Sequence, residues 1–122
     1  MPIVTVEVVA GANDAMIKNL AQSLADAIGG ALKSPPGQTW VRVHFLAHDQ
    51  YAENEAPLDS AQLPVFVTIL KKQTPERAEL EGEVTALSRA VAQAVGRPAA
   101  CVHIEYAPAA GGRLAFGGVL VQ

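Results

Sequence analysis

Two similar apolar stretches decide the fold of this chain: Pro2-Ile-Val-Thr-Val-Glu-Val-Val9, and Pro64-Val-Phe-Val-Thr-Ile-Leu70, which begins 62 residues later. Both are rich in β-branched residues, and in the first one Val4, Val6 and Val8 fall on the same face of a strand. Each stretch is followed by a helical pattern and then by another strand pattern. The sequence therefore predicts a β-α-β unit that occurs twice.

Both helical patterns are amphipathic, with apolar residues spaced three or four positions apart. Asn13 or Asp14 is a candidate cap for the first helix, and Ser34-Pro-Pro-Gly37 ends it. The second helix is predicted to start at Thr74-Pro-Glu76 and to stop at Gly96-Arg-Pro98. The first apolar stripe consists of Ile17, Leu20, Leu24, Ile28 and Leu32, and the second of Leu80, Val84, Leu87, Val91 and Val95.

The strands that close the two units are predicted at Trp40–Leu46 and Val102–Tyr106. A crossover helix implies parallel pairing within each unit. We therefore predict an α+β fold with one four-stranded mixed sheet, both helices on one face, and short hairpins in the loop at 47–62 and near the C-terminus. Residues 1–122 are expected to form a single domain made of two repeat units, 2–60 and 63–122.

The sheet face opposite the helices has no cover within this predicted fold. We expect Ile3, Val9, Trp40 and Val65 to lie on it. An uncovered face that is partly apolar favours association with further copies of the chain.

Composition excludes several classes of protein. The chain has 122 residues, of which 50% are hydrophobic and 17% charged, and its net charge is −3. These values argue against a disordered chain and against nucleic acid as the main partner. The single cysteine, Cys101, allows neither an internal disulfide nor a zinc site built on cysteines.

The sequence also gives no sign of a membrane segment, a cofactor or a metal. No apolar run approaches the roughly 20 residues that a membrane helix needs, and we recognise no signal peptide. We therefore expect a cytoplasmic protein. Neither a metal-ligand spacing nor a phosphate-binding loop is present, so we expect no metal and no cofactor.

Several of these features together resemble one known family. The Met-Pro start, Gly11-Ala-Asn-Asp14 after the first strand, Trp40-Val-Arg-Val-His44, and the glycine-rich end Gly112-Arg-Leu-Ala-Phe-Gly-Gly-Val-Leu120 are similar to the 4-oxalocrotonate tautomerase family. The resemblance covers nearly the whole chain. It implies a fused member with two β-α-β units, which in that family assembles as a homotrimer.

The resemblance also implies a catalytic role for Pro2. Once Met1 is removed, Pro2 presents a secondary amine, and burial near cations lowers the pKa of such an amine until it can act as a general base near neutral pH. The alternative is that Pro2 merely starts a strand, where its missing N–H costs nothing. Pro64 has an amide nitrogen and cannot act as a base, so we expect one working site per chain.

Four further residues are candidates for the site: Arg42 as a second catalytic residue, and Lys72, Lys71 and Tyr51 for substrate binding. The resemblance implies that Arg42 binds a substrate carboxylate, although a solvated or inter-subunit arginine is the alternative. The family's second arginine is replaced by Ala12, and Lys72 or Lys71, at the start of the second helix, is the candidate substitute. Both lysines have the alternative of solubilising a strand end. Tyr51 resembles an aromatic that walls the family's pocket, or else packs within its loop.

The sequence thus favours a cofactor-independent tautomerase that moves a proton between carbon and oxygen of a small anionic enol or 2-keto carboxylic acid. A decarboxylase or a dehalogenase-hydratase of the same superfamily remains an alternative. So does a ferredoxin-like module that binds a small molecule without catalysis.

Overall fold

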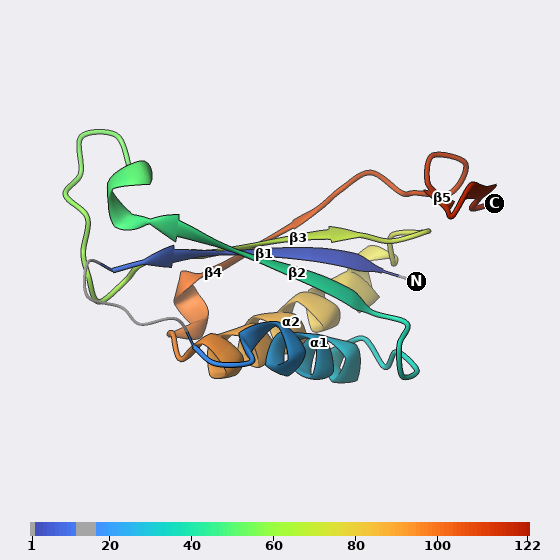
Figure 1. The fold of residues 1–122 in the computed structure, drawn as a ribbon, viewed down its shortest axis with the longest axis horizontal. Helices are drawn as coiled ribbons and strands as arrows, with labels where there is room; N and C mark the ends of the chain where they lie inside the picture. Colours follow the sequence, from blue (N-terminus) through green and yellow to red (C-terminus); the bar gives the residue numbers. More distant parts are fainter. Residues whose placement is uncertain (1, 12–16) are drawn as a thin grey trace.

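The chain is built of two layers, a four-stranded sheet and two helices that both lie against one face of it (Figure 1). The structure, a computed structural model, describes residues 2–11 and 17–122. The elements follow in the order β1 (Ile3–Ala10), α1 (Leu20–Ala31), β2 (Trp40–Ala47), β3 (Val65–Leu70), α2 (Arg77–Val95) and β4 (Val102–Tyr106). Short 3-10 turns, η1 and η2, occupy His48–Gln50 and Ala99–Cys101, and the C-terminal hairpin is formed by β5 (Ala115–Phe116) and β6 (Val119–Leu120).

The sheet has the strand order β2-β1-β3-β4. Strands β1 and β2 are parallel, as are β3 and β4, while β1 and β3 pair antiparallel in the centre. This confirms the predicted α+β fold with its mixed sheet. It also contradicts the ferredoxin-like alternative, because the two strands of each unit are direct neighbours, whereas in a split β-α-β arrangement another strand separates them.

The start of the first helix differs from the prediction. Helix α1 begins at Leu20, so Ile17 lies outside it and is 43% exposed instead of contributing to the apolar stripe. The predicted caps, Asn13 and Asp14, lie outside the described residues. The second helix begins at Arg77 and ends before Gly96, close to the predicted limits.

The two units use the same internal register. Val4 pairs with Val41 in one unit and Val65 pairs with Val102 in the other, so the paired residues are 37 positions apart in both. All four of these side chains are directed at the helices, since they are buried in the core or pack against it. Pro2 is two residues before the core residue Val4, whereas Pro64 is one residue before the core residue Val65. Because side chains alternate along a strand, Pro64 does not occupy the position of Pro2, although each proline begins its apolar stretch.

The core lies between the sheet and the two helices. On the helix side the stripes contribute residues spaced by four positions, and on the sheet side β1 and β3 contribute alternate residues. Twelve of the core residues are Val4, Val6, Val8, Leu20, Leu24, Ile28, Val65, Val67, Ile69, Leu87, Val91 and Val95. Leu80 and Val84 of the predicted second stripe are only half-buried.

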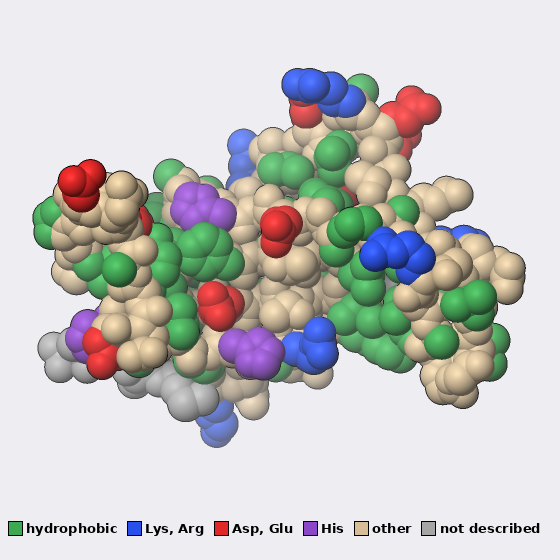
Figure 2. Space-filling model, turned by 90° about the horizontal axis from the view of Figure 1, so that it is seen from above, with side chains coloured by type: hydrophobic (Ala, Val, Ile, Leu, Met, Phe, Trp, Pro, Cys, Tyr) green, Lys and Arg blue, Asp and Glu red, His purple; other side chains and the backbone are tan. Residues whose placement is uncertain are grey.

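The other sheet face is not covered by helices, as predicted, and the space-filling view shows it as a mixed surface of apolar, charged and histidine side chains (Figure 2). Trp40 is 45% exposed there. Two residues expected on this face are fully buried, Val65 and Val9. Val65 lies in the core because β3 starts one position out of phase with the predicted face.

No helix in the described part of the chain is long and apolar enough to cross a membrane.

Leu24 tests the position of the first helix. Replacement of this fully buried side chain by alanine should lower the free energy of unfolding by about 2–5 kcal/mol, because a cavity remains in the core. Ile17→Ala is the matched control and should change it by less than about 0.5 kcal/mol. Denaturant titrations at one protein concentration measure both values, and equal losses would contradict this placement of α1.

Candidate active site

A pocket of about 470 Å³ lies beside Pro2. It opens where the start of β1 meets the loop that follows α1, and we call it the Pro2 pocket. Its lining residues are Pro2, Leu32, Lys33, Ser34, Pro35, Gln38 and Lys71. The pocket therefore combines a candidate base with two cationic side chains.

The central strand pairing brings Lys71 to Pro2. In the antiparallel pair of β1 and β3, Ile3 is the partner of Leu70, so the next residues outward, Pro2 and Lys71, follow on from this pair. Alternation along β3 directs Lys71 to the same side as Val67 and Ile69, which is the helix side. The structure thus places Lys71 in the Pro2 pocket, and its role in substrate binding stays a prediction.

Lys33 is a second pocket cation, which the sequence reasoning missed. It follows the C-terminal end of α1 in the left-handed conformation, with φ of 54°, and its N–H donates to the Gly30 carbonyl at 3.2 Å. The β-α-β crossover was the available signal. Because the helix runs back along β1, its C-terminal end must come to the end of the sheet where β1 starts.

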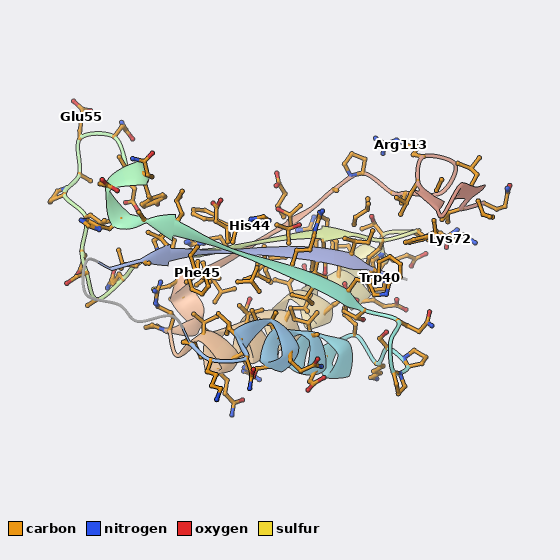
Figure 3. The ribbon with its side chains drawn as sticks, in the orientation of Figure 1. Trp40, His44, Phe45, Glu55, Lys72 and Arg113 are labelled. Carbon is orange, nitrogen blue, oxygen red and sulfur yellow. The ribbon has the colours of Figure 1, made fainter. Side chains whose placement is uncertain are left out.

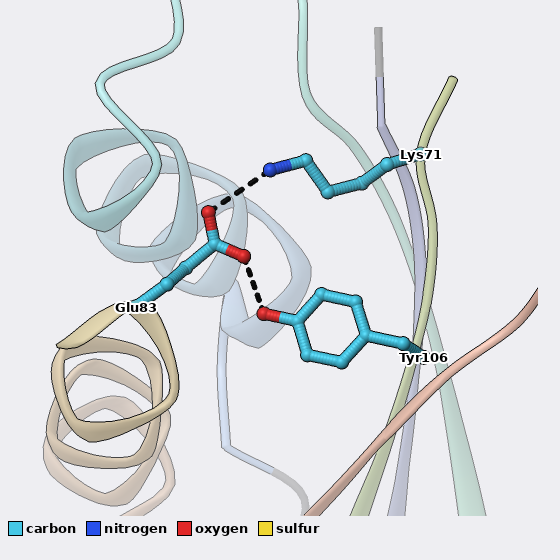
Figure 4. Close-up of polar contacts among 3 residues, drawn as sticks. All are labelled: Lys71, Glu83 and Tyr106. Atoms are coloured by element: carbon cyan, nitrogen blue, oxygen red, sulfur yellow. Dashed lines mark hydrogen bonds and ion pairs between the residues drawn. The ribbon is translucent and has the colours of Figure 1, made fainter. Parts of the chain in front are cut away.

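Lys71 is held by Glu83, which is held in turn by Tyr106 (Figure 4). Its Nζ lies 2.9 Å from Oε1 of Glu83 on α2, and both side chains are mostly buried, with 22% and 15% exposed. The Tyr106 hydroxyl donates to the other carboxylate oxygen of Glu83. Burial, and then the hydrogen bond and the charge of Glu83, raise the pKa of Tyr106 well above its usual range.

A second pocket of about 510 Å³ continues from the first between the two helices. We call it the acidic pocket, because Glu79 and Glu83 lie in its wall. It shares Leu32 and Lys33 with the Pro2 pocket. The two pockets adjoin at these two residues, and we call the pair the cleft; the charge of its lining residues changes from basic near Pro2 to acidic near α2.

Arg42 lies on the opposite side of the sheet from this cleft. It is exposed on the open face, where its Nη2 donates to Oγ1 of Thr5 at 3.3 Å. Arg42 does not line the Pro2 pocket of its own chain. Arg42 could therefore act only at the Pro2 pocket of another protomer.

Lys72 and Tyr51 are also outside the Pro2 pocket. The Lys72 side chain is exposed at the end of β3 (Figure 3), and its carbonyl accepts a hydrogen bond from Gly111. The Tyr51 hydroxyl donates to Glu53 Oε2 at 2.7 Å. This hydrogen bond is the main cause that raises the pKa of Tyr51, and burial and the charge of Glu53 raise it further. Of the two predicted lysines, the structure thus brings only Lys71 to Pro2.

Tyr51 instead begins a row of rings on the open face. Its ring centroid lies 5.8 Å from that of Phe66, which in turn lies 5.6 Å from His103. Phe66, His103 and Glu105 also line a hollow of about 240 Å³ on this face. Within residues 2–11 and 17–122, no group of three or more His, Cys, Asp or Glu side chains is arranged to hold a metal ion.

Comparison with known proteins identifies the fold. No protein-family model matches the chain, and no curated protein sequence matches it significantly. Among solved structures it resembles Pt0534 inactivated by 2-oxo-3-pentynoate, with a TM-score of 0.75, 15% identity and coverage of 98% of this chain and 94% of that one. It also resembles the R7 fused 4-OT, a wild-type asymmetric trimer, with a TM-score of 0.75, 16% identity and coverage of 97% of this chain and 94% of that one. A third similar structure is the macrophage migration inhibitory factor of Trichinella spiralis, with a TM-score of 0.69, 18% identity and coverage of 97% of this chain and 98% of that one.

These neighbours are members of the tautomerase superfamily, so the resemblance predicted from the sequence is confirmed at the level of the fold.

The raised pKa of Tyr106 predicts a loss of stability in alkali. Above pH of about 10 the unfolded chain gives up a phenolic proton that the folded chain retains. The free energy of unfolding that depends on this proton is therefore fully present below pH 10 and falls as the pH rises further. In Tyr106→Phe this part of the decline should be absent, as measured by the melting temperature between pH 8 and 11.5. Parallel curves for the two proteins would contradict the buried hydrogen bond to Glu83.

Proposed function

We propose that this chain, which has the tautomerase-superfamily fold, is a cofactor-independent tautomerase of small enol or 2-keto carboxylic acids, with Pro2 as the general base. The observation that supports this most is the pocket that Pro2 shares with Lys33 and Lys71. A decarboxylase or hydratase reaction on the same proline is the alternative within this fold. A malonate semialdehyde decarboxylase is one of the structural neighbours, with a TM-score of 0.69 and 15% identity, over 94% of this chain and 90% of that one.

The proposed reaction needs a neutral amine and a nearby cation. The amine of Pro2 takes the proton from the enol oxygen, and the ammonium then returns it to the carbon, so that no group is gained or lost. Positive charge from Lys33 favours the neutral form of the amine, while Lys71 is paired with Glu83. Lys33 binds the substrate carboxylate, since it forms no ion pair with any other described residue.

A substrate-binding role for Arg42 requires an oligomer, and we propose the homotrimer that the fused neighbours form. The open face supports this assembly, because it carries Arg42 on the edge strand β2 and Glu105 on the opposite edge strand β4. Opposite charges on opposite edges favour a head-to-tail contact, which closes into a ring. Trp40 and the exposed Val119 and Leu120 of the C-terminal hairpin add apolar surface to this contact. Tyr51 and Lys72 are then candidate substrate contacts from a neighbouring protomer.

Alkylation tests the role of Pro2. Intact mass must first show that Met1 is absent, since otherwise Pro2 is an amide. We then expect 3-bromopyruvate to label Pro2 alone and to abolish the tautomerisation of phenylenolpyruvate, as shown by peptide mapping and ultraviolet absorbance. Pro64→Ala should be labelled and inactivated like the wild type, because its amide nitrogen has no basic lone pair. Absence of turnover in protein that lacks Met1 would refute the proposed function.

Subunit mixing tests the proposed trans role of Arg42. Arg42→Ala protein and wild-type protein alkylated at Pro2 should each be nearly inactive. After subunit exchange at equal amounts, activity should return to about a quarter of the wild-type level, because a random head-to-tail ring pairs an intact Pro2 with an intact Arg42 at that frequency. No recovery, with exchange proven by native mass spectrometry, would show that Arg42 does not act across the interface.

A further inference from the structure

We propose that Glu83 restricts the Pro2 pocket to monocarboxylates, by neutralising Lys71 and by giving the far end of the cleft a negative charge. This inference rests on the proposed function in one respect, namely that the Pro2 pocket receives a carboxylate. It assigns to Glu83 and Tyr106 the role of residues that position Lys71 and set the charge of the site.

The charges of the cleft provide the first argument. Two cations, Lys33 and Lys71, line the Pro2 pocket, but Lys71 is already paired with Glu83 at 2.9 Å. Among the described lining residues of this pocket, one cation is therefore left to compensate a ligand. One carboxylate balances it, whereas a second one would find no unpaired cation among the residues with which this chain lines the pocket.

The geometry of Glu83 provides the second argument, because this carboxylate is not free to move away. One of its oxygens accepts from Lys71 and the other from the Tyr106 hydroxyl, and its side chain is only 15% exposed (Figure 4). The three residues come from α2, β3 and β4. The fold thus holds this carboxylate beside Lys71 through two contacts, so that Lys71 already has a partner when a ligand enters.

The acidic pocket provides the third argument. Both pockets share Lys33 in their walls, so a carboxylate bound at Lys33 lies at their junction, and a ligand long enough to pass this junction enters the pocket lined by Glu79 and Glu83. A second carboxylate there meets the mostly buried Glu83 and the exposed Glu79, and the repulsion from Glu83 is less screened than it would be in water. An apolar or neutral group meets Leu32, Ala31 and Ala86 instead.

Binding of two unreactive acids tests this inference. 4-Methylbenzoate and terephthalate have the same ring, and the second acid carries a carboxylate where the first has a methyl group. Titration calorimetry on the folded, full-length protein should show that the wild type prefers 4-methylbenzoate. In Glu83→Gln the preference should shift toward terephthalate by about tenfold or more, because glutamine keeps partners for Lys71 and Tyr106 but removes the charge.

A matched control and a double variant separate the local charge from a general one. Glu81→Gln removes one charge from the same helix at an exposed position that pairs with Arg77, and it should keep the wild-type preference. Lys71→Met combined with Glu83→Gln removes both charges. This double variant should regain most of the wild-type preference for 4-methylbenzoate. Equal ratios in all four proteins, or a shift of the same size in Glu81→Gln, would overturn the inference, as would failure of the wild type to bind either acid.

The experiment also keeps this inference apart from the proposed function. If the binding preference shifts as expected but phenylenolpyruvate is not turned over, the general-base role of Pro2 fails and the charge selection stands. If the enzyme is active but Glu83→Gln leaves the binding ratio unchanged, only the charge selection fails.

Discussion

The antiparallel pairing of β1 with β3 is the contact on which the rest of the structure depends. It is the only strand pairing in the described sheet that joins the two β-α-β units, and it makes one continuous core out of two half-cores. It also places Lys71 next to Pro2, since the two residues follow the last pair of this ladder. A shift of one residue would turn Lys71 to the open face, because side chains alternate along a strand. The ladder thus determines both the core and the composition of the pocket.

The cleft beside Pro2 shows how one fold provides charges of both signs within a short distance. Lys33 lies just after the C-terminal end of α1, Lys71 lies just after the end of β3, and Glu83 lies on the sheet-facing side of α2. A half-buried lysine without a partner is costly, and Glu83 removes that cost while Tyr106 satisfies the second carboxylate oxygen. The same contacts that stabilise the packing of α2 on the sheet therefore also set the charge of the proposed substrate site.

The two faces of the sheet have different roles in this architecture. The helix-covered face contains the core and, at its edge, the Pro2 pocket, while the open face carries Arg42, the row of rings and the hollow beside Glu105. In a single chain the sheet itself separates these two sets. In the proposed trimer Arg42 would meet the Pro2 of another protomer, and the opposite charges on the edge strands β2 and β4 favour that orientation.

The sequence by itself determined the elements and their order. Regular spacing in the two stripes and alternation in the strands depend only on which side chains avoid water, and this information is local. It gave the two-layer α+β fold, the mixed sheet and the open face, and the residues of the Met-Pro start and the glycine-rich end indicated the superfamily. Local patterns were wrong where phase or boundary mattered, as at Ile17, Val65 and the matching of Pro64 with Pro2. At Val65 and Pro64 one residue of shift reverses the side chain's direction without changing the composition of the window, and at Ile17 the helix begins later than the apolar spacing indicated.

Only the tertiary structure decided the contents of the candidate site. Adjacent residues on a strand point to opposite faces, so only one of Lys71 and Lys72 can face the Pro2 pocket. The sequence did not show which one, and the register of β3 in the structure assigns it to Lys71. The tertiary structure moved Arg42 and Tyr51 away from the Pro2 pocket of the same chain, and it brought in Lys33, Glu83 and Tyr106 from three distant elements. Such a group is assembled by strand register and helix packing, which depend on long-range contacts, so no single window of the sequence contains it.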